Sequence, residues 1–405
     1  MIAGNYNRIS RFALKAGLAS CGLTVLKLVA FRPLPPPLSA APRRSASRLN
    51  GASRNSTGRR RTMAGETIPN TRIPILRSVP SLRSWRRPYM VNQRIVGLVP
   101  TMGALHKGHI SLIRQAAREC HEVVISIYVN PAQFGIKEDL ASYPVTFDSD
   151  VAELARLDRE LVDDGGNLGH ISAVFAPTTA DMYPSGFPGQ EVDSTGSFVT
   201  ITPVSNILEG ASRPTFFRGV ATVCMKLFNA VQPDRAYFGQ KDVQQAVVIR
   251  KMERDFLLPT EIVIGPTMRE QDGLALSSRN VYLGTRRRAV ATVLSSALQA
   301  AEKAYASGKT ATSAILGAAN QVASRELQDQ LALKPKERAL FEVDYLALSD
   351  PETMEEVEAA DPSKGAILTG AIRMLQVQDP QEGEDLGHSG GPLVRLIDNI
   401  ILQPR

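Results

Sequence analysis

The chain has 405 residues, of which 43% are hydrophobic, and a formal net charge of +7. This length allows one large domain or two domains and a tail, with enough apolar residues for a full core. The charge is uneven: residues 1–65 hold twelve lysines and arginines and no acidic residue, whereas residues 66–405 hold 35 basic and 40 acidic residues, a net charge of −5. This distribution argues against a basic nucleic-acid-binding face, so no nucleic-acid partner is predicted.

The three cysteines are Cys21, Cys120 and Cys224, which are widely spaced and form no C-x-x-C pair. An odd count with this spacing excludes a disulfide scaffold and a cysteine-based zinc site. Each cysteine is best interpreted as a small buried apolar residue. A reducing compartment follows, and a cytoplasmic location is expected.

The segment 1–65 is rich in arginine and serine and contains a Pro-Leu-Pro-Pro-Pro run at 33–37. Such a composition predicts a basic, disordered tail. The apolar stretch 12–31 carries Lys15 and Lys27, which makes it a poor membrane span, and no membrane partner is expected. The tail also has the composition of a mitochondrial transit peptide, so a mitochondrial location is the alternative. A competing interpretation is that translation starts at Met63 and the upstream segment is not used.

Apolar runs and helical stripes alternate between residues 66 and 283. Strands are predicted at 95–99, 123–129, 173–176, 235–239 and 261–265, and helices from 109 and over 154–161, 219–231 and 243–256, with an exposed glycine-rich loop at 165–169. A strand, a helix and a strand within about 35 residues form a βαβ unit. The sequence therefore predicts an α/β fold with a Rossmann-like parallel sheet over 66–283.

The pattern changes after Leu283. Long alanine-rich helices are predicted at 289–307 and 312–327, strands at 343–348 and 366–368, and the segment 393–402 closes the chain. This composition indicates a smaller C-terminal α+β domain over 284–405, which could act as a lid.

The segment Pro-Thr-Met-Gly-Ala-Leu-His-Lys-Gly-His, residues 100–109, joins the first strand to the first helix. A helix start offers unpaired N–H groups and a positive dipole end, and two imidazoles there add donors for phosphate oxygens. His106 and His109 are therefore candidate phosphate-binding residues. A zinc pair is the alternative, although no third ligand is evident nearby.

Three further segments carry polar side chains suited to the same chemistry. Leu-Ser-Ser-Arg-Asn at 276–280 could wrap phosphates, because arginine binds them bidentately. In Phe-Gly-Gln-Lys-Asp-Val-Gln-Gln at 238–245, the lysine supplies a charge, and the aspartate either caps the next helix or binds a ribose hydroxyl. Asn-Pro-Ala-Gln-Phe-Gly at 130–135 follows a strand, at the edge where open α/β sheets bind ligands.

These segments, with Leu-Glu-Gly at 208–210, Arg213-Pro, Phe-Arg-Gly-Val-Ala-Thr-Val at 217–223 and Arg-Leu-Ile-Asp-Asn-Ile at 395–400, occur in an order that resembles the pantothenate synthetase family, within the H-x-G-H nucleotidyltransferases. The resemblance covers residues 68–405. It implies an ATP-dependent ligase that condenses pantoate with β-alanine through a pantoyl adenylate, releasing AMP and diphosphate. It also implies Mg²⁺ as cofactor and a homodimer.

The resemblance further assigns roles to individual residues. His106, His109, Lys241, Ser277, Ser278 and Arg279 would bind ATP and act in catalysis, and Met102, Gly239 and Asp242 would complete the ATP site. By the same resemblance, Met102, Gln133 and Gln245 would line the pantoate pocket. The neutral amides of Gln133 and Gln245 can bind a hydroxyl and a carboxylate without neutralising the nucleophile.

The chain departs from the family pattern in three places. Thr215-Phe216 stands where the family usually has Gly-His, the connection around 158–172 is longer than in bacterial members, and the basic tail lies outside the pattern. Competing interpretations are another H-x-G-H nucleotidyltransferase acting on a phosphorylated acceptor, an aminoacyl-tRNA ligase, and a catalytically silent nucleotide-binding protein. The net charge of −5 in residues 66–405 weighs against the second.

Overall fold

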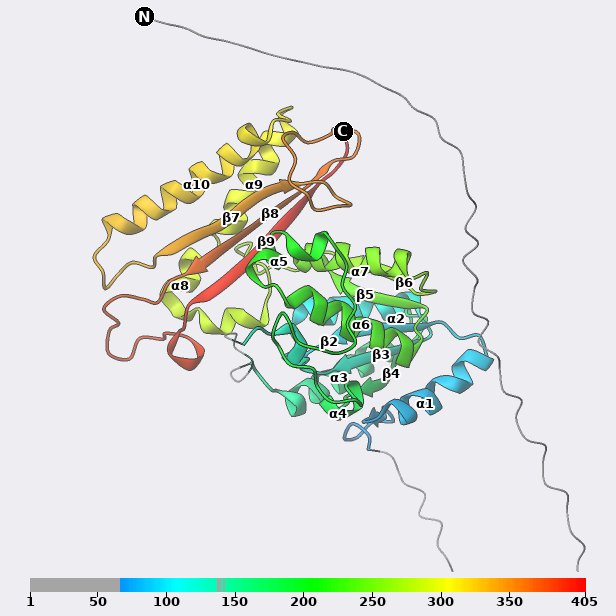
Figure 1. The fold of residues 1–405 in the computed structure, drawn as a ribbon. Helices are drawn as coiled ribbons and strands as arrows, with labels where there is room; N and C mark the ends of the chain where they lie inside the picture. The colour runs from blue at the N-terminus through cyan, green and yellow to red at the C-terminus, as the bar shows by residue number, and fades with distance from the viewer. Residues whose placement is uncertain (1–65, 137–139, 141–142) are drawn as a thin grey trace, which may run out of the picture. The chain divides into compact units, whose positions relative to one another are not determined.

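The computed structural model describes residues 66–136, 140 and 143–405 (Figure 1). The predicted tail at 1–65 lies outside the described residues. Within the described part of the chain, no helix has both the length and the apolar content that a membrane crossing requires.

A six-stranded parallel sheet forms the centre of the first region of the described chain. Its strands are β1 (Ile75–Leu76), β2 (Val96–Thr101), β3 (Glu122–Ile127), β4 (His170–Phe175), β5 (Arg235–Gly239) and β6 (Glu261–Gly265), in the order β1-β4-β3-β2-β5-β6. Apart from the two-residue β1, the strands follow the Rossmann order 3-2-1-4-5. The order reverses between β2 and β5, which pair in parallel, and this switch point is where such sheets bind ligands. The predicted fold class is confirmed.

Helices cover both faces of the parallel sheet (Figure 1). They are α1 (Val79–Val91), α2 (Lys107–Glu119), α3 (Phe147–Asp163), α4 (Thr179–Met182), α5 (Glu209–Ser212), α6 (Phe216–Val231) and α7 (Val243–Asp255). Successive β3 residues alternate between the two faces: Val124 packs in the core under α1, α6 and α7, and Val123 in the core under α2 and α3. The period of two along each strand therefore builds two separate cores.

Helix α1 was not predicted from the sequence. Ser78 caps it, Pro80 stands in its first turn, and Pro88 lies inside it, so the prolines obscure a helical pattern that buries only Leu82 and Arg86. The Arg86 guanidinium donates to the carbonyl oxygen of Gln232 at 2.9 Å, which joins α1 to the end of α6.

A second, antiparallel sheet of three strands follows the parallel one in the chain. Its strands β7 (Phe341–Ser349), β8 (Ala366–Met374) and β9 (Val394–Leu402) lie in that order, and the helices α8 (Gly284–Val290), α9 (Val293–Ala306) and α10 (Thr312–Ala332) belong to the same region. Residues of α9 and of all three strands share one hydrophobic core.

The sequence predicted one helix over 289–307, and the structure has two. A turn at Ala291–Thr292 separates α8 from α9. The buried residues Val290, Leu294, Ala297 and Ala301 keep helical spacing through this turn, so apolar periodicity alone could not reveal the break.

Candidate active site

The carboxyl ends of the parallel strands surround a cavity of about 240 Å³. All eleven residues singled out from the sequence line it: Met102, His106, His109, Gln133, Gly239, Lys241, Asp242, Gln245, Ser277, Ser278 and Arg279. A second cavity, of about 510 Å³, continues from this wall toward β9. The residues that line both cavities are Arg213, Phe216, Lys241, Asp242, Gln245, Ser277 and Arg279.

The two histidines form the N-terminal cap of α2. His106 is the cap residue, and its Nδ1 accepts a hydrogen bond from the Gly108 N–H at 3.1 Å. His109 occupies the third helical position, and its Nδ1 accepts from the His106 N–H at 3.3 Å. The ring centroids lie 4.1 Å apart. The imidazoles thus replace the hydroxyl and carboxylate of an ordinary capping box.

These capping bonds determine what the imidazoles can do in the cavity. Burial, followed by the nearby Lys241 charge, lowers the pKa of His106 to about 4. Burial and the neighbouring His106 lower the pKa of His109 to about 3. Both rings are therefore neutral at pH 7. Because each Nδ1 accepts a bond, each proton resides on Nε2, which leaves two N–H donors suited to phosphate oxygens.

Asp150 fixes the loop that delivers Met102 and His106 to the cavity. Its carboxylate, buried in the first turn of α3, accepts from the N–H groups of Ala104 at 3.0 Å and Leu105 at 2.9 Å. Gly103 has φ +85°, and a Cβ there would lie 3.0 Å from the Asp150 carboxylate, so the loop requires glycine at this point. Sequence reasoning missed Asp150 because 45 residues separate it from Leu105.

Lys241 and Asp242 stand in a 3₁₀ turn, η4 (Gln240–Asp242), that follows β5 directly. The Lys241 Nζ lies 3.3 Å from Asp242 Oδ1. Asp242 occupies the N-cap position of α7 but makes no side-chain capping bond, so the simple capping role proposed for it is absent. From β9, the Asn399 side-chain amide donates to the carbonyl oxygens of Gln240 at 2.9 Å and Lys241 at 2.8 Å, which holds the turn in place.

Ser277, Ser278 and Arg279 form the start of another 3₁₀ turn, η5 (Ser278–Tyr282). The Ser277 hydroxyl caps it by accepting from the Arg279 N–H at 3.2 Å. The loop before this turn is tied to β9 by two hydrogen bonds between Arg269 and the buried Asp398, at 2.5 and 2.9 Å. The turn therefore presents hydroxyls and a guanidinium to the cavity from a fixed backbone.

Gln133 lies in the short turn η1 (Pro131–Gln133) after β3, and its side chain is already engaged. Its Oε1 accepts from Asn130 Nδ2 at 3.1 Å, and its Nε2 contacts the Met102 sulfur at 3.1 Å. Gly219 lets α6 approach this turn closely, since a Cβ there would lie 2.2 Å from the Ala132 carbonyl oxygen. Asn130, which lines the cavity and also accepts from the Tyr183 hydroxyl at 2.7 Å, was missed as a positioning residue.

The adjacent glutamines of α7 have different environments. Gln245 lines both cavities. Gln244 lines only the second cavity, and its buried side chain donates to the carbonyl oxygens of Val204 at 2.8 Å and Ile207 at 2.7 Å, which supports a structural role. Two further cavity-lining hydroxyls, those of Ser126 and Thr267, are buried without a hydrogen-bond partner in the described part of the chain. No sequence pattern pointed to these two.

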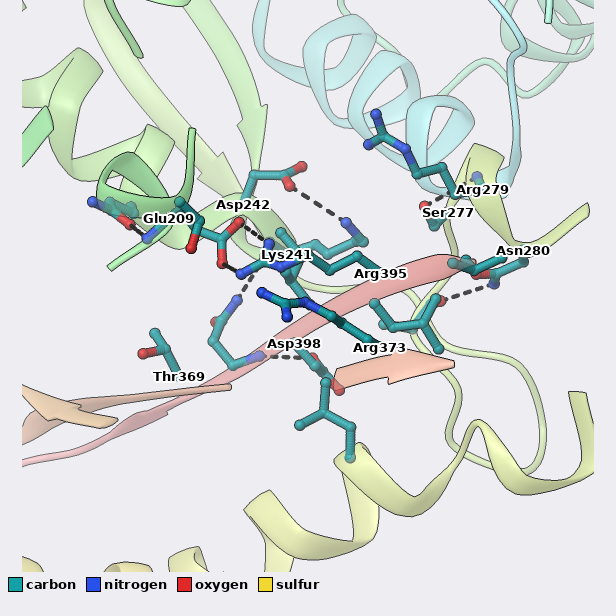
Figure 2. A pocket seen from close by; sticks show the side chains of 18 of the residues that line it. Glu209, Lys241, Asp242, Ser277, Arg279, Asn280, Thr369, Arg373, Arg395 and Asp398 are labelled. Atoms are coloured by element: carbon teal, nitrogen blue, oxygen red, sulfur yellow. Dashed lines mark hydrogen bonds and ion pairs between the residues drawn. The ribbon is translucent and has the colours of Figure 1, made fainter. Parts of the chain in front are cut away.

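Charged side chains from the antiparallel strands β8 and β9 meet charged side chains of α5 and of the turns η4 and η5 at the second cavity (Figure 2). Arg395 of β9 pairs with Glu209 of α5, with 2.7 Å between Nη2 and Oε1, and with Asp344 of β7 at 2.8 Å. The Tyr345 hydroxyl donates to Glu209 at 2.9 Å. Burial and the Glu209 charge raise the pKa of Tyr345, so it remains a proton donor.

A metal ion in this cavity would need some of its coordinating atoms from a bound nucleotide and not only from protein side chains. Among residues 66–136, 140 and 143–405, no cluster of three or more histidine, cysteine or carboxylate side chains could hold a metal ion alone. Mg²⁺ in nucleotide enzymes needs fewer protein ligands because phosphates supply several, and Asp242 is a cavity-lining carboxylate that suits it.

A Rossmann-like sheet with paired neutral histidines at a helix start, a lysine and a Ser-Ser-Arg turn at its switch point defines an H-x-G-H-type α/β nucleotide-binding enzyme. Comparison with known proteins then specifies the family. Residues 74–401 match the model of the pantoate–β-alanine ligase family. The chain belongs to this family.

Individual relatives agree with this assignment. The pantothenate synthetase of Chloroflexus aurantiacus is 42% identical over 331 residues, which cover 82% of this chain and 99% of the relative. The crystal structure of the Thermus thermophilus pantothenate synthetase superposes with a TM-score of 0.63 at 37% identity, covering 82% of this chain and 99% of that one. The Francisella tularensis pantoate–β-alanine ligase, solved with βγ-ATP and β-alanine, has a TM-score of 0.54 at 27% identity and covers 81% of this chain and 97% of its own.

Proposed function

We propose that this protein condenses pantoate with β-alanine, using ATP, to form pantothenate. The observation that carries the proposal is the convergence of all eleven motif residues on one cavity at the carboxyl edge of the sheet. Family membership supports the same reaction. The individual residue roles are those that the family resemblance implies, and the position of these residues around the cavity supports them.

In the first step, the pantoate carboxylate attacks the α-phosphorus of ATP, and diphosphate leaves. No enzyme nucleophile is required, so positioning and stabilisation of charge supply the catalysis. The Nε2–H groups of His106 and His109 donate to phosphate oxygens, and Lys241 with Ser277, Ser278 and Arg279 holds the leaving diphosphate. Met102, Gly239 and Asp242 complete the nucleotide site, and the Gln133–Met102 wall with Gln245 receives pantoate.

In the second step, the amine of β-alanine attacks the acyl carbon of the adenylate, and AMP leaves. The intermediate is a mixed anhydride that water would hydrolyse, so the site must exclude water between the steps. The antiparallel region over 284–405 serves as the cover in this proposal, because β9 contributes Arg395, Asp398 and Asn399 to the wall of the second cavity.

Three further features belong to the proposal. Mg²⁺ would be held by the ATP phosphates together with Asp242, where it would neutralise negative charge on the phosphate oxygens. A homodimer is expected, as is a cytoplasmic location, with mitochondrial import through the basic segment 1–65 as the alternative location. Sedimentation of the purified protein tests the homodimer, and imaging of a fluorescent fusion tests the location.

The test of the function is diphosphate release from the full chain with ATP and Mg²⁺, with and without D-pantoate. We expect release that depends on pantoate, with AMP and pantothenate formed only after β-alanine is added. Diphosphate release that does not depend on pantoate but increases with a phosphorylated acceptor would favour an H-x-G-H nucleotidyltransferase that acts on such an acceptor. ATP binding by a folded protein without any release would indicate a silent nucleotide-binding protein.

A further inference from the structure

The wall shared by the two cavities contains a positively charged side chain to which no role in ATP or pantoate binding has been given above. Arg213, between α5 and α6, lines both cavities, and its Nη2 donates to the main-chain carbonyl oxygen of Gln133 at 3.2 Å. Gln133 is the residue whose side chain contacts Met102 and whose turn follows β3. The guanidinium therefore reaches the acid pocket from a position 80 residues further along the chain.

Phe216 supports this guanidinium. The Cζ of Arg213 lies 3.8 Å from the centroid of the Phe216 ring, well within the range of a cation–π contact. Phe216 also lines both cavities. A planar guanidinium stacks well on an aromatic face and keeps its N–H edge available for hydrogen bonds in the guanidinium plane.

Phe217 supports the Phe216 ring in turn. The two rings meet edge to face, with centroids 4.9 Å apart, and Phe217 is almost completely buried in the core under α6. Phe217, Phe216, Arg213 and the Gln133 carbonyl thus form a continuous series of contacts from the hydrophobic core to the acid pocket. Each member limits the freedom of the next.

We propose that Phe216 is a positioning residue for the pantoate site, which acts by stacking beneath Arg213 and so fixes the Gln133 turn. This inference rests on the proposed function, because it assumes that the pocket beside Gln133 receives the acid. A phenyl ring cannot titrate, so the support is the same at every pH at which the enzyme works. A histidine, which the family motif usually carries here, would become cationic beside Arg213 as the pH falls.

The test compares variants in the first half-reaction, measured as pantoate-dependent exchange of label between diphosphate and ATP. Phe216→Leu removes the π face while keeping an apolar side chain, and its KM for pantoate should rise about tenfold, as expected from loss of a partly desolvated cation–π contact. The KM for ATP should change much less. Phe216→Tyr keeps the face and should restore the pantoate KM.

The matched control lies on the same helix. Arg218 of α6 stacks on Phe198, with its Cζ 4.2 Å from the ring centroid, and donates to the carbonyl oxygens of Glu191 and Val192. Neither Arg218 nor Phe198 lines either cavity. Phe198→Leu should therefore leave the pantoate KM unchanged, although it removes the same kind of contact.

Phe216→His supplies a readout that loss of packing would not produce. The ratio of its pantoate KM to that of the unchanged protein should rise as the pH is lowered from 8 to 5.5, since protonation places a second cation against Arg213. The other charged residues on the shared wall, Lys241, Asp242 and Arg279, are present in both proteins, so the ratio cancels their titration.

The outcomes distinguish the inference from the function on which it rests. A pantoate KM in Phe216→Leu equal to that of the unchanged protein, or a Phe216→His ratio that does not vary with pH, would overturn the inference while leaving the proposed function intact. Absence of pantoate-dependent exchange in the unchanged protein would overturn the proposed function itself. Should Phe216→Leu fail to fold, as judged by circular dichroism, the Phe216→Tyr and Phe216→His measurements decide.

Discussion

The edge of the parallel sheet and the antiparallel strand β9 hold their polar side chains by different means. At the parallel edge, uncharged groups hold the functional histidines: the Nδ1 atoms of His106 and His109 accept from backbone N–H groups. Across the second cavity, full charges meet, with Arg395 between Glu209 and Asp344. The first arrangement fixes proton positions, and the second joins segments that are distant in the sequence.

The difference shows how one site can combine donors that are preorganised at the parallel edge with ion pairs that attach the antiparallel sheet. Neutral hydrogen bonds within one helix turn depend little on salt and leave Nε2–H groups available for a ligand. Ion pairs between buried or half-buried side chains are strong only while both partners remain in place, since loss of one leaves an uncompensated charge. Substitutions on the two sides should therefore fail in different ways.

The largest effect is expected at the parallel edge. His106→Ala removes one positioned donor to the phosphates, and adenylate formation should slow by about 10²–10³-fold, by analogy with the loss of an oxyanion donor. Because α2 keeps its backbone, the far-ultraviolet circular dichroism should be unchanged. Pantoate-dependent diphosphate release measures the rate, and a folded variant with normal release would contradict the role given to His106.

The next effect is expected on the charged side. Glu209→Ala removes the acceptor of the Tyr345 hydroxyl and one of the two carboxylates that pair with Arg395, which keeps Asp344, and the free energy of unfolding should fall by about 2 kcal/mol. Urea unfolding followed by circular dichroism measures the loss. If the stability were unchanged while only the second half-reaction slowed, the ion pairs would serve catalysis without stabilising the fold.

The lowered histidine pKa values predict a loss of stability in acid. Because the folded values of about 4 and about 3 lie below the ordinary 6.5, the unfolded chain binds more protons between these limits. Stability is therefore complete above pH 6.5 and decreases as the pH falls through that value. Between pH 7 and 5 we expect a loss of about 2–4 kcal/mol from the pair, measured by urea unfolding.

A variant that lacks both imidazoles, His106→Asn with His109→Asn, provides the control for this pH dependence. Its unfolding free energy should depend less on pH over the same interval. An equally steep dependence in the double variant would assign the acid sensitivity to other groups.

The smallest effect is expected at an exposed ion pair. Arg156 on α3 pairs with Glu153 and Glu160, in the i,i+3 and i,i+4 positions. Arg156→Ala should leave the melting temperature essentially unchanged, because exposed pairs are screened by water. This variant is the counterpart of Glu209→Ala. A comparable loss of stability in both variants would mean that burial does not set the ion pairs of Arg395 apart from exposed ones.

The sequence predicted the βαβ order and placed the carboxyl ends of β2 to β6 to within two residues, because both depend on local patterns. Residues 95–99 lie in β2 or directly before it, and 261–265 coincide with β6. The candidate phosphate-binding residues lie in the segments that follow β2, β5 and β6, so they could be expected at one edge of the sheet. Their convergence on one cavity agrees with that expectation, whereas their individual roles stay predictions.

The contacts that sequence reasoning missed join distant segments. Asp150 holds the loop of Met102, and Asn399 holds the turn of Lys241, but neither is adjacent to its partner in the chain. Gln244 and Gln245 look alike in sequence, and only the packing of α7 distinguishes Gln244, which is buried and lines the second cavity alone, from Gln245, which lines both cavities. Such distinctions depend on tertiary structure, which no local pattern contains.

The contacts of Asp398 and Asn399 bear on how this protein can be recombined with its relatives. Asp398 holds Arg269, and Asn399 holds the backbone of Gln240 and Lys241, across separations of 129 to 159 residues. A chimera joined near residue 283 would place a foreign strand against these turns. Exchange of residues 284–405 alone would therefore preserve the site only if the donor strand supplied an aspartate and an asparagine in the register of β9.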